Sequence, residues 1–415
     1  MAVVESSADS TNISWKRNLY TLWIAQLLTI VGFSLRAPFL PFFLDDLGAN
    51  TFASQAIWSG VINAGGALVM AVSAPVWGII ADRFGRKPMV LRAMFFGAFT
   101  IGLMSLATNP WHLLILRFFE GAFTGTVAAS TTLVASTTPK RSMGFALGMM
   151  QTAVFTGASI GPLFGGLLAD YIGFRPTFIA AGSMLFIGGI IVLLLVHEDF
   201  TPPKRGKDAG ASNGPGLRTL LFGGAMIGMV AVMFALRTST SAIQPIMPLY
   251  VQQLTSATGS IATLSGLTLG VAGVTSAIAA VMLGRLADRI GHKVILISST
   301  VAVGLLYLPM AIAQSPFQLI VMNGLLGVAA GGVMPSANAI VANLTPSQRR
   351  GAVYGFLAAA TSVGGFVGPL GGAGLAAAVD IRYVFVVTGL LMLLAGLWVF
   401  HIIRSGADIE GVEED

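Results

Sequence analysis

A ten-residue stretch that occurs twice in the chain constrains the fold more than any other feature. The first copy, GIIADRFGRK, runs from Gly78 to Lys87, and the second, GRLADRIGHK, runs from Gly284 to Lys293. Equivalent residues in the two copies are 206 positions apart, about half of the 415 residues. Each copy separates two apolar runs and carries an acid, several bases and two glycines, so each predicts a charged hairpin between two membrane-spanning helices.

Matching residues outside this stretch extend the repeat along the chain. Ser59 corresponds to Ser265 at the same separation of 206, and Pro38 corresponds to Pro245 at 207, a change that one inserted residue explains. The sequence is therefore a duplication of one half. Two parallel halves of this kind are typical of a transporter that holds its ligand between two helical bundles near the middle of the membrane.

The composition excludes an ordinary soluble protein. Hydrophobic residues make up 55% of the chain, charged residues only 10%, and the mean hydropathy is +0.83. These values predict an all-α polytopic membrane protein with twelve transmembrane helices, each about 20 residues or more and able to cross about 30 Å of hydrocarbon. The expected spans are 18–44, 56–80, 88–107, 111–136, 143–168, 176–196, 217–251, 261–286, 294–313, 316–342, 351–377 and 383–403.

The spans group into two pseudo-symmetric six-helix bundles. We expect an N-terminal bundle over residues 1–197 and a C-terminal bundle over residues 217–415. Between them, residues 198–216 contain three prolines, three bases and several glycines, a composition that predicts a flexible linker on the same side of the membrane as the hairpins.

The positive charge follows the predicted loops. Eighteen of the 23 lysines and arginines fall in segments that this topology places on the side of the hairpins and of both termini. Because cytoplasmic loops of membrane proteins are enriched in these residues, both termini are expected to be cytoplasmic. The high pI of about 9.8 thus requires no nucleic-acid partner.

Several chemistries are not expected. The chain has no cysteine, which excludes disulfides and thiolate metal sites, and its four histidines have no metal-ligand spacing on a predicted membrane helix. The spans contain no paired acids, HExxH or GxSxG, so we expect no catalytic residues, no metal and no cofactor. A membrane enzyme and a passive channel or receptor are the rival classes, and the half-chain duplication favours a transporter over both.

A glycine-rich run lies inside the fifth predicted span. Small residues spaced four apart let helices pack closely in a membrane, and a proline within a span removes a backbone hydrogen bond and bends the helix, which could serve gating. The residues of this run are Gly157, Gly161, Pro162, Gly165 and Gly166.

Together, three patterns resemble the major facilitator superfamily. They are the GxxADRxGRK hairpin at Gly78, the RxxxG pattern from Arg117 to Gly121, and the GxxxGPxxGG run at Gly157. They are most similar to its twelve-helix drug:proton antiporter branch, which includes tetracycline and multidrug exporters, and the resemblance covers residues 16–403. It implies a monomer in a bacterial cytoplasmic (inner) membrane, with lipid, protons and a small-molecule substrate as partners. The implied activity is proton-coupled export of drugs or small amphipathic molecules by alternating access.

The resemblance also implies a role for the hairpins. In the family, the hairpin acid and the arginine after it tie the two bundles together in one state and release them in the other. The second copy has His292 where the first has Arg86, so its contacts are expected to differ. The gating residues carried over are Gly78, Asp82, Arg83, Gly85, Arg86, Lys87, Asp288 and Arg289.

Four ionisable residues lie well inside the predicted spans: Arg36, Arg117, Glu120 and Arg237. A charge inside the membrane costs at least about 2.5 to 3.5 kcal/mol, so each is a candidate for function or for a buried ion pair. Glu120 is the only acid near the midplane, and the family commonly has glutamine at this position. We predict that it carries the coupling proton and, when protonated, frees Arg117 for a substrate; the alternative is a structural pair with Arg117.

Polar stripes on the first, fourth and seventh spans are predicted to line a central cavity. For Arg36 and Arg237, which lie near one edge of the core, the alternative is that they extend to the membrane surface or, for Arg36, pair with Asp45 or Asp46. The predicted proton and substrate pathway comprises Gln26, Thr29, Phe33, Arg36, Arg117, Glu120, Thr124, Arg237 and Gln244.

The sequence leaves the substrate open. A drug exporter would need an adaptable apolar cavity, whereas a carrier of organic anions or lysolipids would use Arg36, Arg117 and Arg237 as fixed positive charge.

Overall fold

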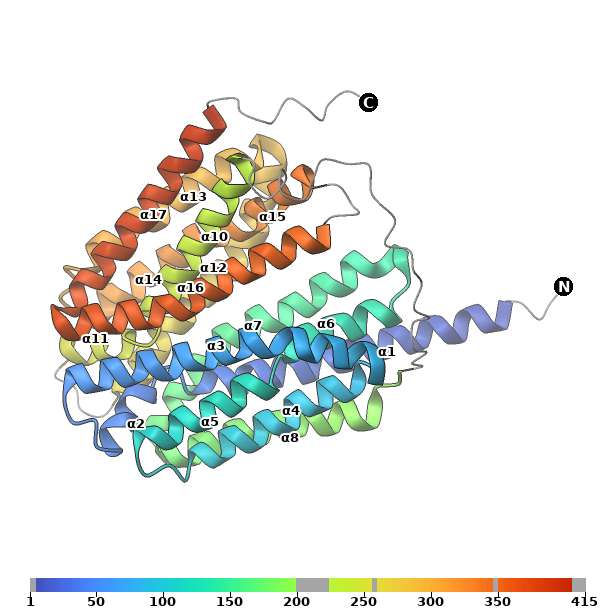
Figure 1. Cartoon of the computed structure of the whole chain (residues 1–415), viewed down its shortest axis with the longest axis horizontal. Coiled ribbons are helices and arrows are strands. Elements are labelled where there is room, and N and C mark those ends of the chain that lie inside the picture. The colour runs from blue at the N-terminus through green and yellow to red at the C-terminus, as the bar shows by residue number, and fades with distance from the viewer. Residues whose placement is uncertain (1–4, 199–223, 256–259, 346–349, 405–415) are drawn as a thin grey trace.

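The computed structural model describes residues 5–198, 224–255, 260–345 and 350–404. Within these ranges the chain is helical without strands, and 12 helices or joined helix pairs are long and apolar enough to cross a membrane. Figure 1 shows them in two bundles, one coloured blue to green and the other yellow-green to red. The prediction of an all-α membrane protein with twelve spans in two bundles is confirmed.

The helices of the N-terminal bundle follow the predicted order. They are α1 (Glu5–Leu35), α2 (Leu40–Asp46), α3 (Phe52–Phe84), α4 (Lys87–Met104), α5 (Pro110–Phe123), α6 (Thr126–Thr137), the 3-10 turn η1 (Lys140–Ser142), α7 (Met143–Ile172) and α8 (Phe174–Leu195).

The C-terminal bundle repeats this order. Its helices are α10 (Gly224–Ile243), α11 (Met247–Leu254), α12 (Ile261–Ile290), α13 (His292–Met310), α14 (Pro316–Gly331), α15 (Val333–Leu344), α16 (Arg350–Ala378) and α17 (Ile381–Arg404). Except for Glu198, the predicted linker lies outside the described residues.

Four spans predicted as continuous helices are broken, which corrects that part of the prediction. The first and fourth spans of each half are each built from two helices: α1 and α2, α5 and α6, α10 and α11, and α14 and α15. In the first pair, Pro38 lies in the turn and Pro41 lies in the first turn of α2. Proline has no backbone N–H to donate and blocks helix continuation, so these repeated prolines mark breaks.

A glycine permits the break in the fourth span. Gly125, between α5 and α6, has φ of 120°, a backbone conformation that residues with a Cβ rarely adopt. Glu120 lies in the last turn of α5, which ends at Phe123, and the break at Thr124 and Gly125 separates it from α6.

The two bundles pack against each other at the end opposite the hairpins, which we call the closed end. There α7 packs on α12 and α3 packs on α16. A Cβ on Gly166 would lie 2.2 Å from the carbonyl oxygen of Ala262, and one on Gly60 would lie 2.6 Å from that of Pro369. Glycine is therefore needed at both places because two backbones meet across the interface.

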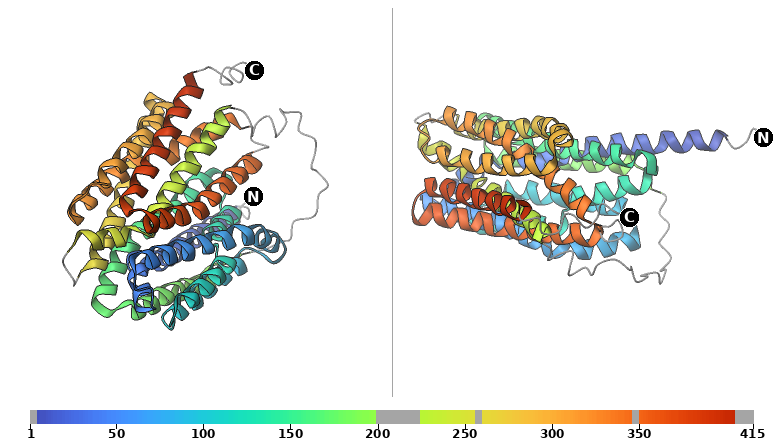
Figure 2. Two further views of the ribbon diagram at one scale, coloured as in Figure 1. Left: turned by 60° about the vertical axis from the view of Figure 1, so that its left-hand side comes forward. Right: turned by 90° about the horizontal axis from the view of Figure 1, so that it is seen from above.

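At the other end, which we call the hairpin end, the bundles diverge (Figures 1 and 2). No hydrogen bond or ion pair between two described residues joins the bundles there. Each hairpin turns at a glycine with positive φ, 93° at Gly85 and 99° at Gly291. The structure is closed at one end and open at the end that carries the charged hairpins.

We expect Gly166→Ala to separate the bundles at the closed end, because the new methyl group would meet backbone that no rotamer change can move. Spin labels at Leu106 and Ile312, two exposed residues at the closed end of opposite bundles, measure the change by pulsed electron resonance. The matched control is Gly148→Ala on the same helix, where an added Cβ meets no atom within 4 Å. Equal distance distributions in the two variants would contradict the close backbone contact between the bundles at Gly166.

Candidate functional site

Glu120 is the centre of a buried ion cluster. Its side chain is only 3% exposed, near the end of α5. Arg36 donates to both carboxylate oxygens, at 2.8 Å from Nη1 to Oε2 and 2.9 Å from Nη2 to Oε1, and Arg117 donates to Oε1 as well. One carboxylate is thus held by two guanidinium groups, one of them in the two-pronged geometry that arginine forms best.

The helix breaks explain why these three residues meet. Arg36 lies in the turn between α1 and α2, and Arg117 lies one helical turn before Glu120 on α5. The alternative that Arg36 extends to the membrane surface or pairs with Asp45 or Asp46 is wrong, because Arg36 is 8% exposed and bound to Glu120. The proposed pairing of Glu120 with Arg117 is present, with Arg36 as a second partner.

The cluster is not electrically balanced. Two arginines and one ionised glutamate leave a net charge of +1, and no other acid in the described residues contacts them. The Nε of Arg117 is buried without a hydrogen-bond partner, packed over Gly66 of α3. An excess charge in a low-dielectric site acts strongly on anything that enters beside it.

A small cavity adjoins the cluster. It has a volume of about 120 Å³ and is lined by both bundles, with Phe33, Arg36 and Arg117 on one side and Gln244 on the other. Four residues of the predicted pathway, separated widely in the sequence, therefore line one space between the bundles. Their role in transport stays a prediction.

Other members of the predicted polar stripes are buried within the N-terminal bundle. Gln26 and Thr29 are both 0% exposed. The amide of Gln26 donates to the hydroxyl of Thr126 at 3.4 Å, and Thr29 lies against Gly188 of α8. The hydroxyl of Thr124 donates to the carbonyl oxygen of Glu120 at 2.7 Å. These three side chains support the break and the bundle core, and none of them lines the small cavity beside the ion cluster.

Arg237 is placed differently from the other three charges. It is exposed on α10, beside Gly365 of α16, where an added Cβ would be 3.4 Å from the arginine Nε. No acid in the described residues pairs with it. Arg237 therefore adds a second uncompensated positive charge, outside the residues that line the small cavity.

An acid that was not predicted anchors the first hairpin. Glu198, after the end of α8, accepts hydrogen bonds from the backbone N–H groups of Arg86 at 2.9 Å and Lys87 at 2.7 Å. The Nζ of Lys87 donates in return to the carbonyl oxygens of Leu193 and Val196 at the end of α8. The carboxylate caps the start of α4 and the ammonium caps the end of α8, so the hairpin is fixed to its own bundle.

The remaining hairpin residues form no bond between bundles in the described structure. The side chain of Asp82 lies outside the described residues, and Arg83 is exposed. In the second hairpin, Nε2 of His292 lies 3.5 Å from Oδ1 of Asp288, a pair that the first hairpin cannot form because it has Arg86 at that position. The gating role of both hairpins stays a prediction.

The closed end contains a bond between the bundles that was also not predicted. Asp170, near the end of α7, accepts hydrogen bonds from the backbone N–H of Thr263 at 2.7 Å and from its hydroxyl at 2.6 Å. Thr263 lies in the first turn of α12, where the unpaired N–H groups of a helix favour a carboxylate. The bond joins the two bundles.

The glycine-rich run packs α7 on two sides. An added Cβ would lie 2.8 Å from Ile30 at Gly157, 2.5 Å from Ser34 at Gly161 and 1.9 Å from the carbonyl of Leu35 at Gly165, all on α1 or its end. Gly166 instead faces α12, and α7 continues through Pro162. The run therefore brings α7 against its own bundle and against the other one.

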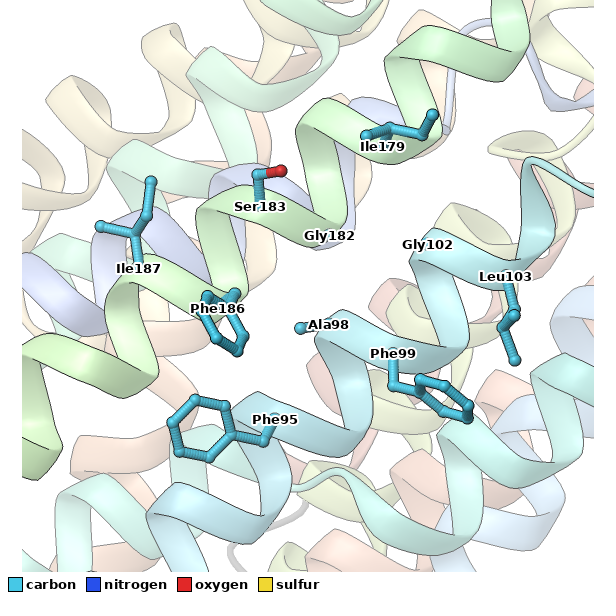
Figure 3. A pocket seen from close by; sticks show the side chains of 10 residues that line it. All are labelled: Phe95, Ala98, Phe99, Gly102, Leu103, Ile179, Gly182, Ser183, Phe186 and Ile187. Carbon is cyan, nitrogen blue, oxygen red and sulfur yellow. The ribbon is translucent and has the colours of Figure 1, made fainter.

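A cavity of about 630 Å³ lies elsewhere, between α4 and α8 (Figure 3). Phe95, Phe99 and Phe186 line it, and the only hydroxyl in its wall is that of Ser183. None of the predicted pathway residues borders it. Such an apolar, exposed surface on a membrane helix pair is suited to hydrocarbon contact, so its size does not make it the functional site.

Comparison with known proteins gives a consistent family. A family profile described as Major Facilitator Superfamily matches residues 22–259 and again residues 229–414. A multidrug resistance protein MdtG of Salmonella dublin is 36% identical over 404 residues, which cover 96% of this chain and 98% of the relative. A multi-drug resistance efflux pump PmrA homolog of Lactococcus lactis subsp. lactis is 34% identical over 392 residues, with 94% and 95% covered.

Solved structures show the same fold at low sequence identity. A bacterial homolog of the human lysosomal transporter Spinster, in an inward-facing and occupied conformation, has a TM-score of 0.76 at 14% identity, with 93% of this chain and 96% of the other covered. The human organic anion transporter MFSD10 (TETRAN) has a TM-score of 0.67 at 19% identity, with 93% and 99% covered.

The twelve spans in two bundles, together with the family match, define a polytopic membrane transporter. The chain belongs to the Major Facilitator Superfamily. The resemblance that the hairpin and the glycine-rich run indicated is confirmed.

Cysteine labelling tests which pathway residues are open. We expect Gln244→Cys, at an exposed position lining the small cavity, to react with a water-soluble thiol reagent in the purified protein. Gln26→Cys and Thr29→Cys should react far more slowly, because these positions are fully buried. The natural chain has no cysteine and provides the blank. Equal labelling rates at all three positions would contradict the burial.

Proposed function

We propose that the chain exports drugs or small amphipathic molecules in exchange for protons, by alternating access of a site between its bundles. The observation that carries the proposal is the burial of Glu120, the only described carboxylate in the ion cluster, against two arginines beside a cavity that both bundles line. The names of the multidrug relatives support the substrate class. We propose a monomer in a bacterial inner membrane as the working form.

The distribution of bases supports an orientation. If the basic hairpins and both termini are cytoplasmic, the open end faces the cytoplasm and the closed end faces outward. The structure is then the inward-facing state, in which a substrate enters from the cytoplasm. The Asp170–Thr263 bond would hold the outer end shut in this state and break when the bundles rock.

The sign of the charge determines how proton and substrate affect each other. With Glu120 ionised the cluster carries +1, and with Glu120 protonated it carries +2 and loses the group that holds Arg36 and Arg117 together. A cationic amphipathic substrate binds beside the +1 cluster more readily than beside the +2 cluster. Proton and drug then exclude each other at one site, which is the condition for exchange.

A carrier of organic anions or lysolipids is the second candidate, and the excess positive charge favours it. Arg237 and the net +1 of the cluster offer fixed positive charge without a described acid to balance it. For an anionic substrate the sign reverses, because protonation of Glu120 increases the attraction and proton and substrate bind together. Drug export is therefore distinguished from anion or lysolipid transport by whether protons are released or taken up when the substrate binds.

Glu120→Gln should abolish proton-driven accumulation of a fluorescent cationic dye in reconstituted vesicles while still permitting downhill exchange. The variant fixes the cluster at +2, so dye affinity should fall about tenfold, in the usual range of coupling energies. Glu120→Gln combined with Arg117→Gln restores +1 and should restore affinity without restoring accumulation.

If the Glu120→Gln variant still concentrates dye when driven by a pH gradient, the proton travels elsewhere. Asp45 and Asp46 are then the next carriers to test, together with Asp82. Partial burial and the neighbouring Asp45 raise the pKa of Asp46, and Arg175 lowers it.

Asp170→Ala should weaken the closed end. Loss of the exposed charge-assisted bonds to Thr263 costs about 1 kcal/mol, which shifts the balance between closed and open outer ends about fivefold. Spin labels at Leu106 and Ile312 report the shift as a longer distance component. Thr263→Val, which keeps the backbone N–H donor, should give a smaller shift. An unchanged distribution for Asp170→Ala would show that the bond does not hold the gate.

A further inference from the structure

A second charged cavity lies away from the ion cluster, inside the N-terminal bundle near the hairpin end. We call it the lateral arginine cavity. It has a volume of about 240 Å³ and lies between α3, α4 and α6. Trp77, Met70 and Ala74 of α3, and Thr124 and Ala128 on the side of α6, line it, and so do two arginines, Arg86 and Arg92.

Arg92 is held in place by its neighbours but has no carboxylate partner among the described residues. Its guanidinium lies 3.5 Å from the centre of the Trp77 ring, the close stack that arginine forms on an aromatic face. Its Nη2 lies 3.5 Å from the carbonyl oxygen of Thr124, and its Nε is buried without a hydrogen-bond partner. No described carboxylate pairs with it. Its Nη1 donates to the sulfur of Met89 at 3.7 Å, so the described chain gives this guanidinium only neutral acceptors and leaves its charge unbalanced.

Arg86 adds a second positive charge to the same wall. Its backbone N–H is bound by Glu198, which leaves the side chain to line the cavity, and no described acid pairs with that side chain. Arg86 precedes α4 and Arg92 lies within it, so their backbone positions are about 9 Å apart along the helix axis. Two long arginine side chains on one wall at that separation can both reach one phosphodiester headgroup.

The depth and the walls indicate a lipid. Arg92 lies five residues after Lys87, about 7.5 Å into the span, at the boundary between headgroups and hydrocarbon. Met70, Ala74 and Ala128 supply apolar wall beside the arginines, which an acyl chain can cover.

The second half of the duplicated fold has no equivalent of the stacked Trp77–Arg92 pair. At the repeat separation of 206, the residues that correspond to Trp77 and Arg92 are Leu283 and Ser298. The second half builds the same helices without the stacked arginine. The cation–aromatic pair is therefore a property of the N-terminal bundle alone.

We propose that the lateral arginine cavity binds the phosphate of an anionic phospholipid from the leaflet at the hairpin end, with Arg92 and Arg86 as the phosphate-binding residues. Trp77 positions Arg92. The bound headgroup would lie beside Thr124, whose N–H and hydroxyl both donate to the carbonyl oxygen of Glu120. Lipid occupancy would thus stabilise the helix break that carries the ion cluster.

The test uses the purified full-length chain, delipidated in detergent and titrated with phosphatidylglycerol. We expect bound lipid in native mass spectra and a raised unfolding temperature for the wild type. Arg92→Gln and Arg86→Gln should each weaken binding about tenfold, the effect of one lost charge-assisted hydrogen bond. The matched control is Arg141→Gln, an exposed arginine outside the cavity at the same end, which should bind as the wild type does.

Phosphatidylcholine and inorganic phosphate distinguish the source of the phosphate. Neither should reproduce the effect of phosphatidylglycerol at the same concentration. Equal binding of phosphatidylglycerol to the wild type and to Arg86→Gln and Arg92→Gln would overturn the proposal. So would an equal effect of inorganic phosphate, which would make the cavity a site for a free anion. If Arg92→Gln fails to fold, Arg86→Gln decides the question.

Discussion

The burial of one carboxylate between two guanidinium groups is the interaction on which the structure depends. Glu120 is nearly inaccessible, and its ionised form is tolerable there only because Arg36 and Arg117 bind it directly. Arg36 reaches it because the first span breaks at its prolines, and Glu120 lies in the last turn of its helix, which ends where Gly125 allows a turn. The breaks, the cluster and the cavity beside it therefore form one unit, and a change in the proton on Glu120 acts on all of them.

The two halves of the duplicated fold contribute unequally to the ion cluster and its cavity. Both halves break their first and fourth spans at equivalent places, yet among the described residues only the N-terminal half buries an acid. The C-terminal half contributes Gln244 to the cavity wall and Arg237 nearby. The two bundles thus have the same helical arrangement, but the buried acid lies in the N-terminal one. Protonation in that bundle can therefore bias the motion of both bundles.

The sequence was sufficient to predict the twelve-span fold and the residues of the ion cluster. It was insufficient to predict how those residues are arranged. Repeat spacing and hydropathy predicted twelve spans in two halves, and an acid within a span identified Glu120. The pairing of Glu120 with Arg117 was among the alternatives, but its second partner, Arg36, was missed because it is 84 positions away and was placed by assuming an unbroken helix. The repeated prolines were visible, and reading them as breaks would have placed Arg36 correctly. Glu198 and Asp170 gave no such signal, since an acid near a span end is ordinarily solvated.

Proton release on substrate binding is the most direct test of Glu120 as the shared site. A pH-indicator dye in weakly buffered detergent solution reports protons as a cationic drug is added to the purified protein, near the midpoint of the pH dependence of binding. If proton and drug exclude each other at Glu120, the wild type releases up to about one proton per drug bound, and both Glu120→Gln and Glu120→Gln with Arg117→Gln release none. Proton uptake by the wild type, or release that persists in both variants, would contradict exchange at this residue.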